Sequence, residues 1–233
     1  MENLLVEYMN KRFSNGKIIA EPAIGPGPVI TISRQTGCGA SGLAYEVSKV
    51  FNNLNPSSGK TLPWHFINRE ILEKSAKELN LEPSHLHKVI TDKERGIMDQ
   101  IVEALSSHMH KSDQKIMKTV RDVIRQFAEQ GNVIIVGRGG AIVSRDIERS
   151  LHVRLEAPLE WRVGVIMTNL GFSREYSREY IRKSDEERAM YVQKMFPGNN
   201  RELLYDLVLN PSRFSRNQLI ETITALARIK GIL

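Results

Sequence analysis

A glycine-rich segment follows a short apolar run near the start of the chain, in the sequence VITISRQTGCGASG at residues 29–42. Its glycines are Gly37, Gly39 and Gly42, and a helical pattern of apolar residues begins at Leu43. Glycine lets the backbone approach an anion closely, and a helix N-terminus offers unpaired N–H groups and a positive dipole end. The order of strand, glycine-rich loop and helix therefore predicts a phosphate-binding site.

The segment differs from the P-loop pattern G-x-x-x-x-G-K-[ST] at two positions. With Gly39 as the second glycine, Arg34 replaces the first glycine and Ala40 replaces the lysine. Ser41 keeps the hydroxyl that binds Mg²⁺ in this pattern. The missing lysine argues against ordinary ATP chemistry, and a tight turn that uses glycine only for packing is the alternative. If the loop binds a triphosphate, Arg34 is the nearest candidate in sequence for the missing charge.

Cys38 is the only cysteine of the chain and lies inside the glycine-rich segment. An internal disulfide is therefore impossible, and the sequence gives no sign of an oxidising compartment. A helix N-terminus can lower the pKa of a thiol, but no histidine partner lies nearby in the sequence. We interpret Cys38 as a small residue that fits a crowded turn rather than as a nucleophile or redox switch.

The composition bounds the class of protein. With 233 residues, 41% of them hydrophobic and 26% charged, the chain is typical of one globular domain. A formal charge of +6 favours anionic ligands, which include nucleotides, nucleic acids and anionic surfaces. No apolar run approaches the ~18 residues of a membrane span, and no signal segment begins the chain. We therefore expect a cytoplasmic protein without a membrane partner.

Five apolar runs, separated by helical patterns, predict a parallel sheet whose strands are joined by right-handed crossovers. The first run begins at Val29, and the others are Pro63–Asn68, Val133–Val136, Leu151–Leu155 and Tyr205–Leu209. The ligand site of such a sheet lies beyond the carboxyl ends of its strands. At these ends we expect the glycine-rich segment to meet Asn68 with Arg69, Gly137 with Arg138, and the residues after Leu155.

Helical patterns account for much of the remaining chain. Helices are expected at Glu2–Arg12, Arg69–Asn80, Pro83–His110 and Ser112–Gln130. A Pro/Gly linker at residues 21–28 follows the first helix. The sequence leaves three arrangements open for this helix: docking on the body, pairing with another subunit to form an oligomer, or fraying. The histidines in this region show no metal-site spacing, and they are His85, His87, His108 and His110.

A stripe of arginines is expected on one face of a helix that Ser173 caps. The stripe consists of Arg174, Arg178, Arg182, Asp185 and Arg188, which project within an arc of roughly 120°. Arginine offers a planar fork that grips phosphate oxygens and keeps its charge during a reaction. The alternative is a solvent-exposed helix whose arginines pair with neighbouring glutamates at helical spacing.

Taken in order, several segments resemble those of the cytidylate kinase-like branch of the nucleoside monophosphate kinases, from Val29 to the C-terminus. They are ITISRQTGCGASG, FINRE, VIIVGRGGAIV, LEAPLEWRV, KSDEER and YDLVLN. The resemblance implies a P-loop kinase-like α/β fold, with three α/β/α layers and a five-stranded parallel sheet. It places a helical insert at about 69–130 and an arginine-rich lid at about 162–196, and residues 1–28 precede this domain.

The resemblance also implies roles for individual residues. Those expected at the donor nucleotide are Gly37, Cys38, Gly39, Ala40, Ser41, Gly42 and Arg162, with Ser41 also at the metal. Those expected at the substrate are Asn68, Arg69, Arg138, Asp185 and Arg188. The catalytic candidates are Arg34, Arg138, Arg182 and Arg188. Gly139 replaces the aspartate of the family's Gly-Arg-Asp element, which puts recognition of cytosine or ribose in doubt.

The implied activity is transfer of the γ-phosphoryl group of ATP, with Mg²⁺, to a nucleoside monophosphate of the CMP type or a related small acceptor. Phosphoryl transfer depends mainly on alignment and on positive charge around the transferred group. One rival is a nucleotide-binding module that lost turnover with the lysine. The other is a basic nucleic-acid-binding protein, which we do not expect because no aromatic-interleaved basic patch is present.

Overall fold

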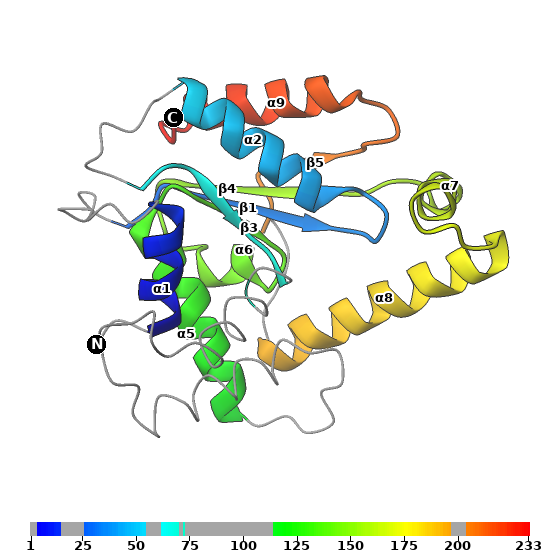
Figure 1. The fold of residues 1–233 in the computed structure, drawn as a ribbon, viewed down its shortest axis with the longest axis horizontal. Coiled ribbons are helices and arrows are strands. Elements are labelled where there is room, and N and C mark those ends of the chain that lie inside the picture. Colours follow the sequence, from blue (N-terminus) through cyan, green and yellow to red (C-terminus); the bar gives the residue numbers. More distant parts are fainter. Residues whose placement is uncertain (1–3, 15–25, 55–61, 70–71, 73–113, 197–203) are drawn as a thin grey trace.

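The computed structural model describes residues 4–14, 26–54, 62–69, 72, 114–196 and 204–233. Five strands form one parallel sheet in the order β2-β3-β1-β4-β5 (Figure 1). The strands are β1 Val29–Arg34, β2 His65–Ile67, β3 Val133–Val136, β4 Ser150–Leu155 and β5 Leu207–Leu209. Helices cover both faces of this sheet, which confirms the predicted three-layer α/β fold.

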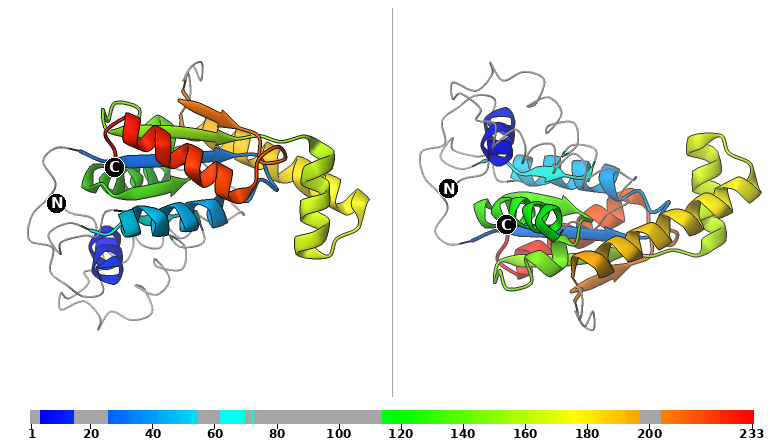
Figure 2. Two further views of the ribbon diagram at one scale, coloured as in Figure 1. Left: turned by 90° about the horizontal axis from the view of Figure 1, so that it is seen from above. Right: turned by 90° about the horizontal axis from the view of Figure 1, so that it is seen from below.

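Helices α2 (Ala40–Leu54) and α9 (Arg216–Ile229) pack on one face of the sheet, in front in the left view of Figure 2. The other face carries α1 (Leu4–Phe13), α5 (Gln114–Gln130) and the short α6 (Gly140–Val143). Each face has its own buried apolar cluster, and β1 contributes to both clusters because its side chains alternate. A sheet covered in this way requires the continuous apolar runs that the sequence shows.

The strand register brings the carboxyl ends of neighbouring strands to one level. Ile32 of β1 pairs with Val136 of β3 on one side and with Val153 of β4 on the other. The loops that follow these strands therefore leave the sheet side by side. This edge is where the sequence predicts a ligand site.

The N-terminal helix docks on the body of the same chain. Its apolar residues Leu5, Val6 and Met9 are fully buried in the cluster to which α5 belongs. The side-chain amide of Asn10 also donates to Gln130 Oε1 at the end of α5, at 2.9 Å. Docking on the body was the first of the three arrangements that the sequence left open for this helix.

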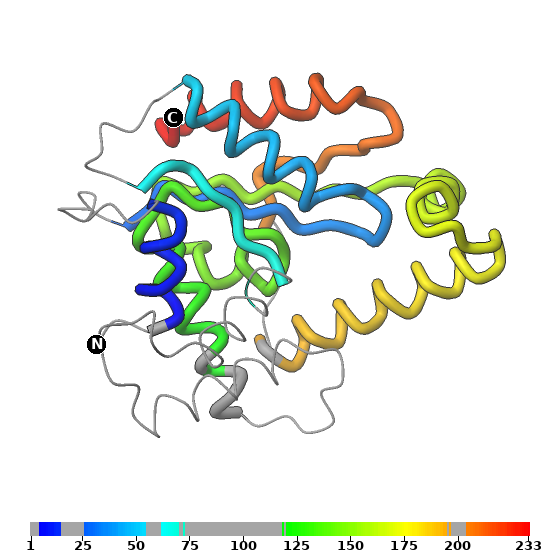
Figure 3. The backbone as a smooth tube through the Cα atoms, viewed as in Figure 1, coloured from blue at the N-terminus to red at the C-terminus, as the bar shows by residue number. Residues whose placement is uncertain are grey.

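Helices α7 (Leu159–Leu170) and α8 (Arg174–Met195) extend beyond the carboxyl ends of the strands, and α8 returns toward α5 and α6 (Figure 3). Ser173 caps α8 as predicted, because its hydroxyl accepts a hydrogen bond from the backbone N–H of Tyr176. A small apolar cluster joins the two helices through Val163, Ile166 and Ile181. The region predicted as a lid is therefore a helical hairpin held by its own packing.

Part of the expected helical insert lies outside the described residues. This applies to most of Arg69–Asn80 and to all of Pro83–His110 with its histidines, whereas the predicted helix Ser112–Gln130 corresponds to α5. No group of three or more His, Cys, Asp or Glu within the described ranges is arranged to hold a metal ion. No helix in the same ranges is long and apolar enough to cross a membrane.

Candidate active site

The glycine-rich loop connects β1 to the N-terminus of α2, which begins at Ala40. Gln35 ties the loop to the end of β4, because its N–H donates to Leu155 O and its side-chain carbonyl accepts from Ala157, each at 3.0 Å. Gly37 has φ of 92°, and a Cβ at this position would lie 3.1 Å from Cβ of Arg162. Backbone conformation and close packing both favour glycine here.

Asp185 of α8 is the centre of a hydrogen-bond network on this loop. Its Oδ1 accepts from the backbone N–H and the hydroxyl of Thr36, both at 2.7 Å, and from Arg188 at 2.9 Å. Its Oδ2 accepts from Nη1 of Arg162 at 2.8 Å. One carboxylate thus joins α7, α8 and the glycine-rich loop.

Arg162 of α7 supports the loop from inside the protein. Its side chain is only 9% exposed, and it donates to the backbone carbonyls of Ala157 at 3.0 Å and Thr36 at 3.3 Å. Burying a guanidinium requires such partners together with the paired carboxylate of Asp185. Its expected contact with the donor nucleotide stays a prediction. In the structure, Arg162 contacts the glycine-rich loop through Thr36.

Arg188 lies between the loop and a second arginine. Its guanidinium donates to the hydroxyl of Thr36 at 3.0 Å. Burial lowers the pKa of Arg188, the carboxylate of Asp185 opposes this shift, and the charge of Arg138 lowers the pKa further. Two guanidiniums close enough to influence each other create a positive potential that suits an anion.

Arg138 follows β3 in the loop whose Gly137 N–H donates to Ile32 O at 3.0 Å. Arg138 has φ of 55°, which is uncommon for a residue with a side chain and occurs often at functional sites. Its guanidinium carbon lies 4.7 Å from the centre of the Tyr191 ring on α8. Beside it, the ring of Phe196 lies against Gly139, where a Cβ would meet Cε2 of Phe196 and the ring would have to move.

Two further predicted residues meet at the start of α2. The side-chain amide of Asn68, at the end of β2, lies 3.2 Å from the hydroxyl of Ser41. Arg69 follows Asn68, and its charge acts on Tyr191. The carboxyl ends of β1, β2 and β3 therefore bring together the residues that the sequence placed there.

Arg34 lies at the end of β1 with its guanidinium against Gly137, where a Cβ would require the guanidinium to move. This position is on the same edge of the sheet as Arg138. Ala40, which replaces the P-loop lysine, is 4% exposed at the start of α2. A lysine there would have to extend from a buried position toward the loop.

The arginine stripe divides into two groups in the structure. Asp185 and Arg188 contact the glycine-rich loop. Arg182 is 57% exposed and pairs with glutamates on its own helix, Glu179 and Glu186. The other two members, Arg174 and Arg178, both pair with Glu160 of α7. Arg182 thus forms the ion pairs at helical spacing that the alternative interpretation expected, whereas Arg174 and Arg178 form exposed ion pairs with another helix. The contacts described for Arg182 do not include the glycine-rich loop, so its expected catalytic role stays a prediction.

Cys38 is buried in the glycine-rich loop. Burial raises the pKa of its thiol to about 11, although the charge of Arg162 acts in the opposite direction. A thiol with this pKa is protonated at neutral pH and is a poor nucleophile. The structure is therefore consistent with a small residue that packs in the turn.

Three residues of the site were missed by sequence reasoning, namely Thr36, Tyr191 and Arg216. Thr36 lay inside the quoted loop, and Tyr191 lies three residues after Arg188, which is the spacing of one helix face. Arg216 begins α9, donates to Gly39 O at 3.2 Å and pairs with Glu46 at 3.3 Å. No local sequence pattern predicts the contact of Arg216 with Gly39, because the two residues are 177 positions apart in the chain.

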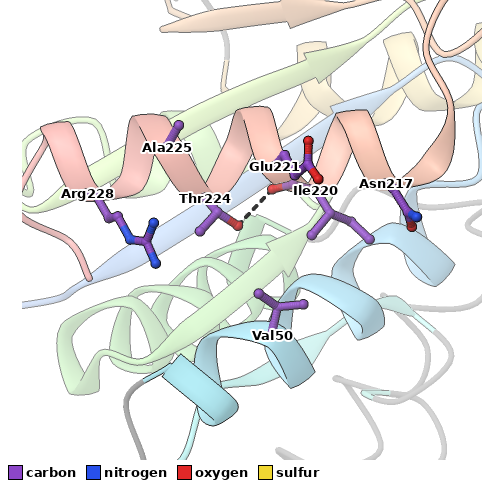
Figure 4. Close-up of a pocket in the computed structure, with 7 residues that line it drawn as sticks. All are labelled: Val50, Asn217, Ile220, Glu221, Thr224, Ala225 and Arg228. Atoms are coloured by element: carbon purple, nitrogen blue, oxygen red, sulfur yellow. Dashed lines mark hydrogen bonds between the residues drawn. The ribbon is translucent and has the colours of Figure 1, made fainter.

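A surface groove lies between α2 and α9, with a volume of about 370 Å³ (Figure 4). It is lined by Val50, Asn217, Ile220, Glu221, Thr224, Ala225 and Arg228. None of these residues belongs to the network around Asp185 or to the predicted site residues. The groove is therefore separate from the candidate active site.

A similar fold occurs in a solved structure of another protein. A solved structure of a protein described as uncharacterized, from Eubacterium ventriosum ATCC 27560, is similar with a TM-score of 0.60. It shares 16% identity over 86% of this chain and 97% of that chain. A shikimate kinase from Bacteroides thetaiotaomicron matches with a TM-score of 0.43 and 14% identity, over 86% of this chain and 98% of that one.

A curated relative is a uronate isomerase of Corynebacterium glutamicum, 26% identical over 121 residues. The match covers 52% of this chain and 23% of that protein, so the chain spans about a quarter of its length. A family model, described as the cytidylate kinase-like family, matches residues 29–213, from β1 to the segment before α9. This range contains the glycine-rich loop, Arg138 and the α7–α8 hairpin, and it confirms the resemblance seen in the sequence. The chain therefore belongs to the cytidylate kinase-like family.

Proposed function

We propose that this protein is an ATP-dependent phosphotransferase that transfers the γ-phosphoryl group of ATP to a nucleoside monophosphate of the CMP type or a related small acceptor. The position of Arg188 is the observation that carries the proposal. Its guanidinium donates to Thr36 in the glycine-rich loop and lies close enough to Arg138 for that charge to lower its pKa. In this proposal, an arginine between the donor-phosphate loop and the acceptor-phosphate arginine stabilises the charge that develops during phosphoryl transfer.

Each part of the site has a distinct task in this proposal. The N–H groups of the loop and the N-terminus of α2 hold the phosphates of the donor. Arg138 and Arg188 hold the acceptor and keep it aligned with the donor. The α7–α8 hairpin covers the reacting groups and excludes water, which would otherwise hydrolyse the donor.

The start of α2 fits a magnesium ion bound together with ATP. Ser41 presents a hydroxyl oxygen, and the amide of Asn68 lies 3.2 Å from it. Mg²⁺ prefers such oxygen ligands and takes few of them from the protein, with phosphates and water completing its shell. Ser41 would hold the ion, which when bound neutralises negative charge on the donor phosphates.

A nucleotide-binding module without turnover is the second candidate function. Two observations favour it: Ala40 stands where the P-loop lysine is expected, and the carboxylate of Asp185 accepts the N–H of Thr36 in the loop. A nucleic-acid-binding role has less support, because the exposed arginines of α8 pair with glutamates instead of forming an open basic surface.

A coupled assay of ADP release tests the proposal. The protein is incubated with ATP·Mg²⁺ and, in turn, with a panel of nucleoside monophosphates and small alcohols, while calorimetry measures ATP binding in parallel. A phosphotransferase releases ADP at a rate that depends on one class of acceptor. ATP binding without any acceptor-dependent release selects the binding module, and the absence of ATP binding by the folded protein contradicts both functions.

A further inference from the structure

Tyr191 lies on α8 three residues after Arg188, so the two side chains share one face of the helix. The guanidinium carbon of Arg138 is 4.7 Å from the centre of the Tyr191 ring. The charge of Arg138 also acts on Arg188. Tyr191 therefore belongs to the part of the candidate site where the two arginines meet.

The hydroxyl of Tyr191 has no acceptor for its proton among the residues that the structure describes. Its oxygen is buried and makes no hydrogen bond within the usual geometric limits to the residues that the structure describes. The guanidinium of Arg138 acts on this oxygen as a donor but cannot accept a hydrogen bond, so the hydroxyl proton has no acceptor there. A phenylalanine ring would contact Arg138 equally well, so the cation–π contact does not require a hydroxyl. A buried O–H without an acceptor is unfavourable in the folded protein, which indicates that a ligand supplies the acceptor.

The charge state of Tyr191 makes it a hydrogen-bond donor. Burial raises the pKa of its phenol, while the charge of Arg138, a hydrogen bond from Arg138 and the charge of Arg69 act to lower it. The net shift is upward, so the hydroxyl keeps its proton at neutral pH.

The groups that meet in this part of the site are therefore donors. Arg138 and Arg188 carry guanidinium N–H groups, and Tyr191 adds an O–H. The nearby carboxylate of Asp185 is already paired with Arg162, Arg188 and Thr36. Donors and positive charge without a free acceptor suit an anion that offers several oxygen atoms, such as a phosphate monoester.

We propose that Tyr191 binds the acceptor: its hydroxyl donates a hydrogen bond to an oxygen of the phosphate group that Arg138 and Arg188 hold. This assignment rests on the proposed function, since it adds a third donor to the acceptor side of that site. It also names the class of acceptor, which is a phosphate monoester rather than an uncharged alcohol.

Calorimetric titration with inorganic phosphate tests the assignment without any need for turnover. Tyr191→Phe keeps the ring and removes the hydroxyl, so we expect the phosphate Kd to rise about tenfold, as for loss of one hydrogen bond to a charged group. The melting temperature of this variant should stay close to that of the wild type, because the hydroxyl proton has no acceptor in the ligand-free protein. Tyr176→Phe is the matched control on the same helix, where the side chain is 57% exposed, and it should leave the Kd unchanged.

Arg138→Ala identifies the pocket in which phosphate binds, because this variant loses an arginine there and leaves the glycine-rich loop intact. Phosphate binding that weakens in Arg138→Ala and in Tyr191→Phe supports the assignment, whether or not the enzyme assay detects transfer. Wild-type phosphate affinity in Tyr191→Phe overturns it, and so does a wild-type protein that binds no phosphate at millimolar concentration. An equal loss of affinity for ATP and phosphate in Tyr191→Phe points to a damaged fold and also overturns the assignment.

Discussion

Asp185 and Thr36 are 149 residues apart in the sequence and are joined by two hydrogen bonds of 2.7 Å, from the backbone N–H and the hydroxyl of Thr36 to one carboxylate oxygen. The same carboxylate pairs with Arg162 and Arg188. The contact fixes α8 on the glycine-rich loop. It also places a negative group on a backbone N–H of the loop for which we propose phosphate binding.

Asp185→Ala should lower the free energy of unfolding by about 2–3 kcal/mol, because it leaves the buried guanidinium of Arg162 without its carboxylate. Urea unfolding measures this change. Arg182→Ala is the matched control on the same helix, and it removes exposed ion pairs that contribute only about 0–1 kcal/mol. Equal stability of Asp185→Ala and the wild type would show that the network does not hold the hairpin to the loop.

Arg188→Ala should reduce kcat by on the order of 10²-fold or more, with little change in affinity for ATP, because an arginine at the reacting phosphoryl group acts mainly in the transition state. Arg182→Ala, whose guanidinium faces solvent, should keep kcat within about threefold of the wild type. Steady-state kinetics with the acceptor found in the screen gives both values. The reverse order of the two effects would mean that α8 rotates or shifts during the reaction.

Gly39→Ala should weaken ATP binding at least about tenfold and cost about 1–2 kcal/mol in stability, since Gly39 has φ of 67°, a conformation that a side chain disfavours. Gly164→Ala in α7 meets no atom within 4 Å and should raise stability by about 0.5–1 kcal/mol through helix propensity. Calorimetry and thermal unfolding provide the two readouts. Unchanged ATP affinity in Gly39→Ala would move the donor site away from this loop.

Arg34→Ala distinguishes an active kinase from a binding module. If Arg34 supplies the charge that Ala40 lacks, its removal should lower kcat by on the order of 10²-fold, and Ala40→Lys should bring no gain. Arg216→Ala is the comparison, because Arg216 also contacts the loop, through Gly39 O. If Ala40→Lys raises kcat and Arg34→Ala leaves it unchanged, the result would favour the nucleotide-binding module.

Acidification should destabilise the protein through His65. Burial lowers the pKa of His65 from 6.5 to about 4, so the folded protein binds fewer protons than the unfolded chain between these values. The stability from this group is complete above pH 6.5 and is lost as the pH falls toward 4, by on the order of 3 kcal/mol. His65→Phe retains an aromatic ring against Phe13 and should flatten the dependence of unfolding free energy on pH in this range. An unchanged slope would assign the acid sensitivity to other groups.

Local patterns in the sequence determined the fold and the edge of the sheet that carries the site. The apolar run Val133–Val136 became β3 with all four residues buried, and Ser173 caps α8 as its residue type and position predict. Glycine-rich turns after apolar runs placed Gly37 and Arg138 at neighbouring strand ends. These features depend on residues close together in the chain, so propensity and periodicity are enough to find them.

The tertiary structure alone decided which residues of α8 enter the site. Arg182 and Arg188 are six residues apart and so differ by about 120° around the helix, which turns one to solvent and the other to the loop. Arg174 and Arg178 lie about 15–21 Å from Arg188 along the axis, beyond the reach of the loop. Helical periodicity shows which side chains share a face, but the rotation and position of α8 come from its packing on α7 and from the contact between Asp185 and the glycine-rich loop. Those interactions join distant parts of the chain, and no local pattern encodes them.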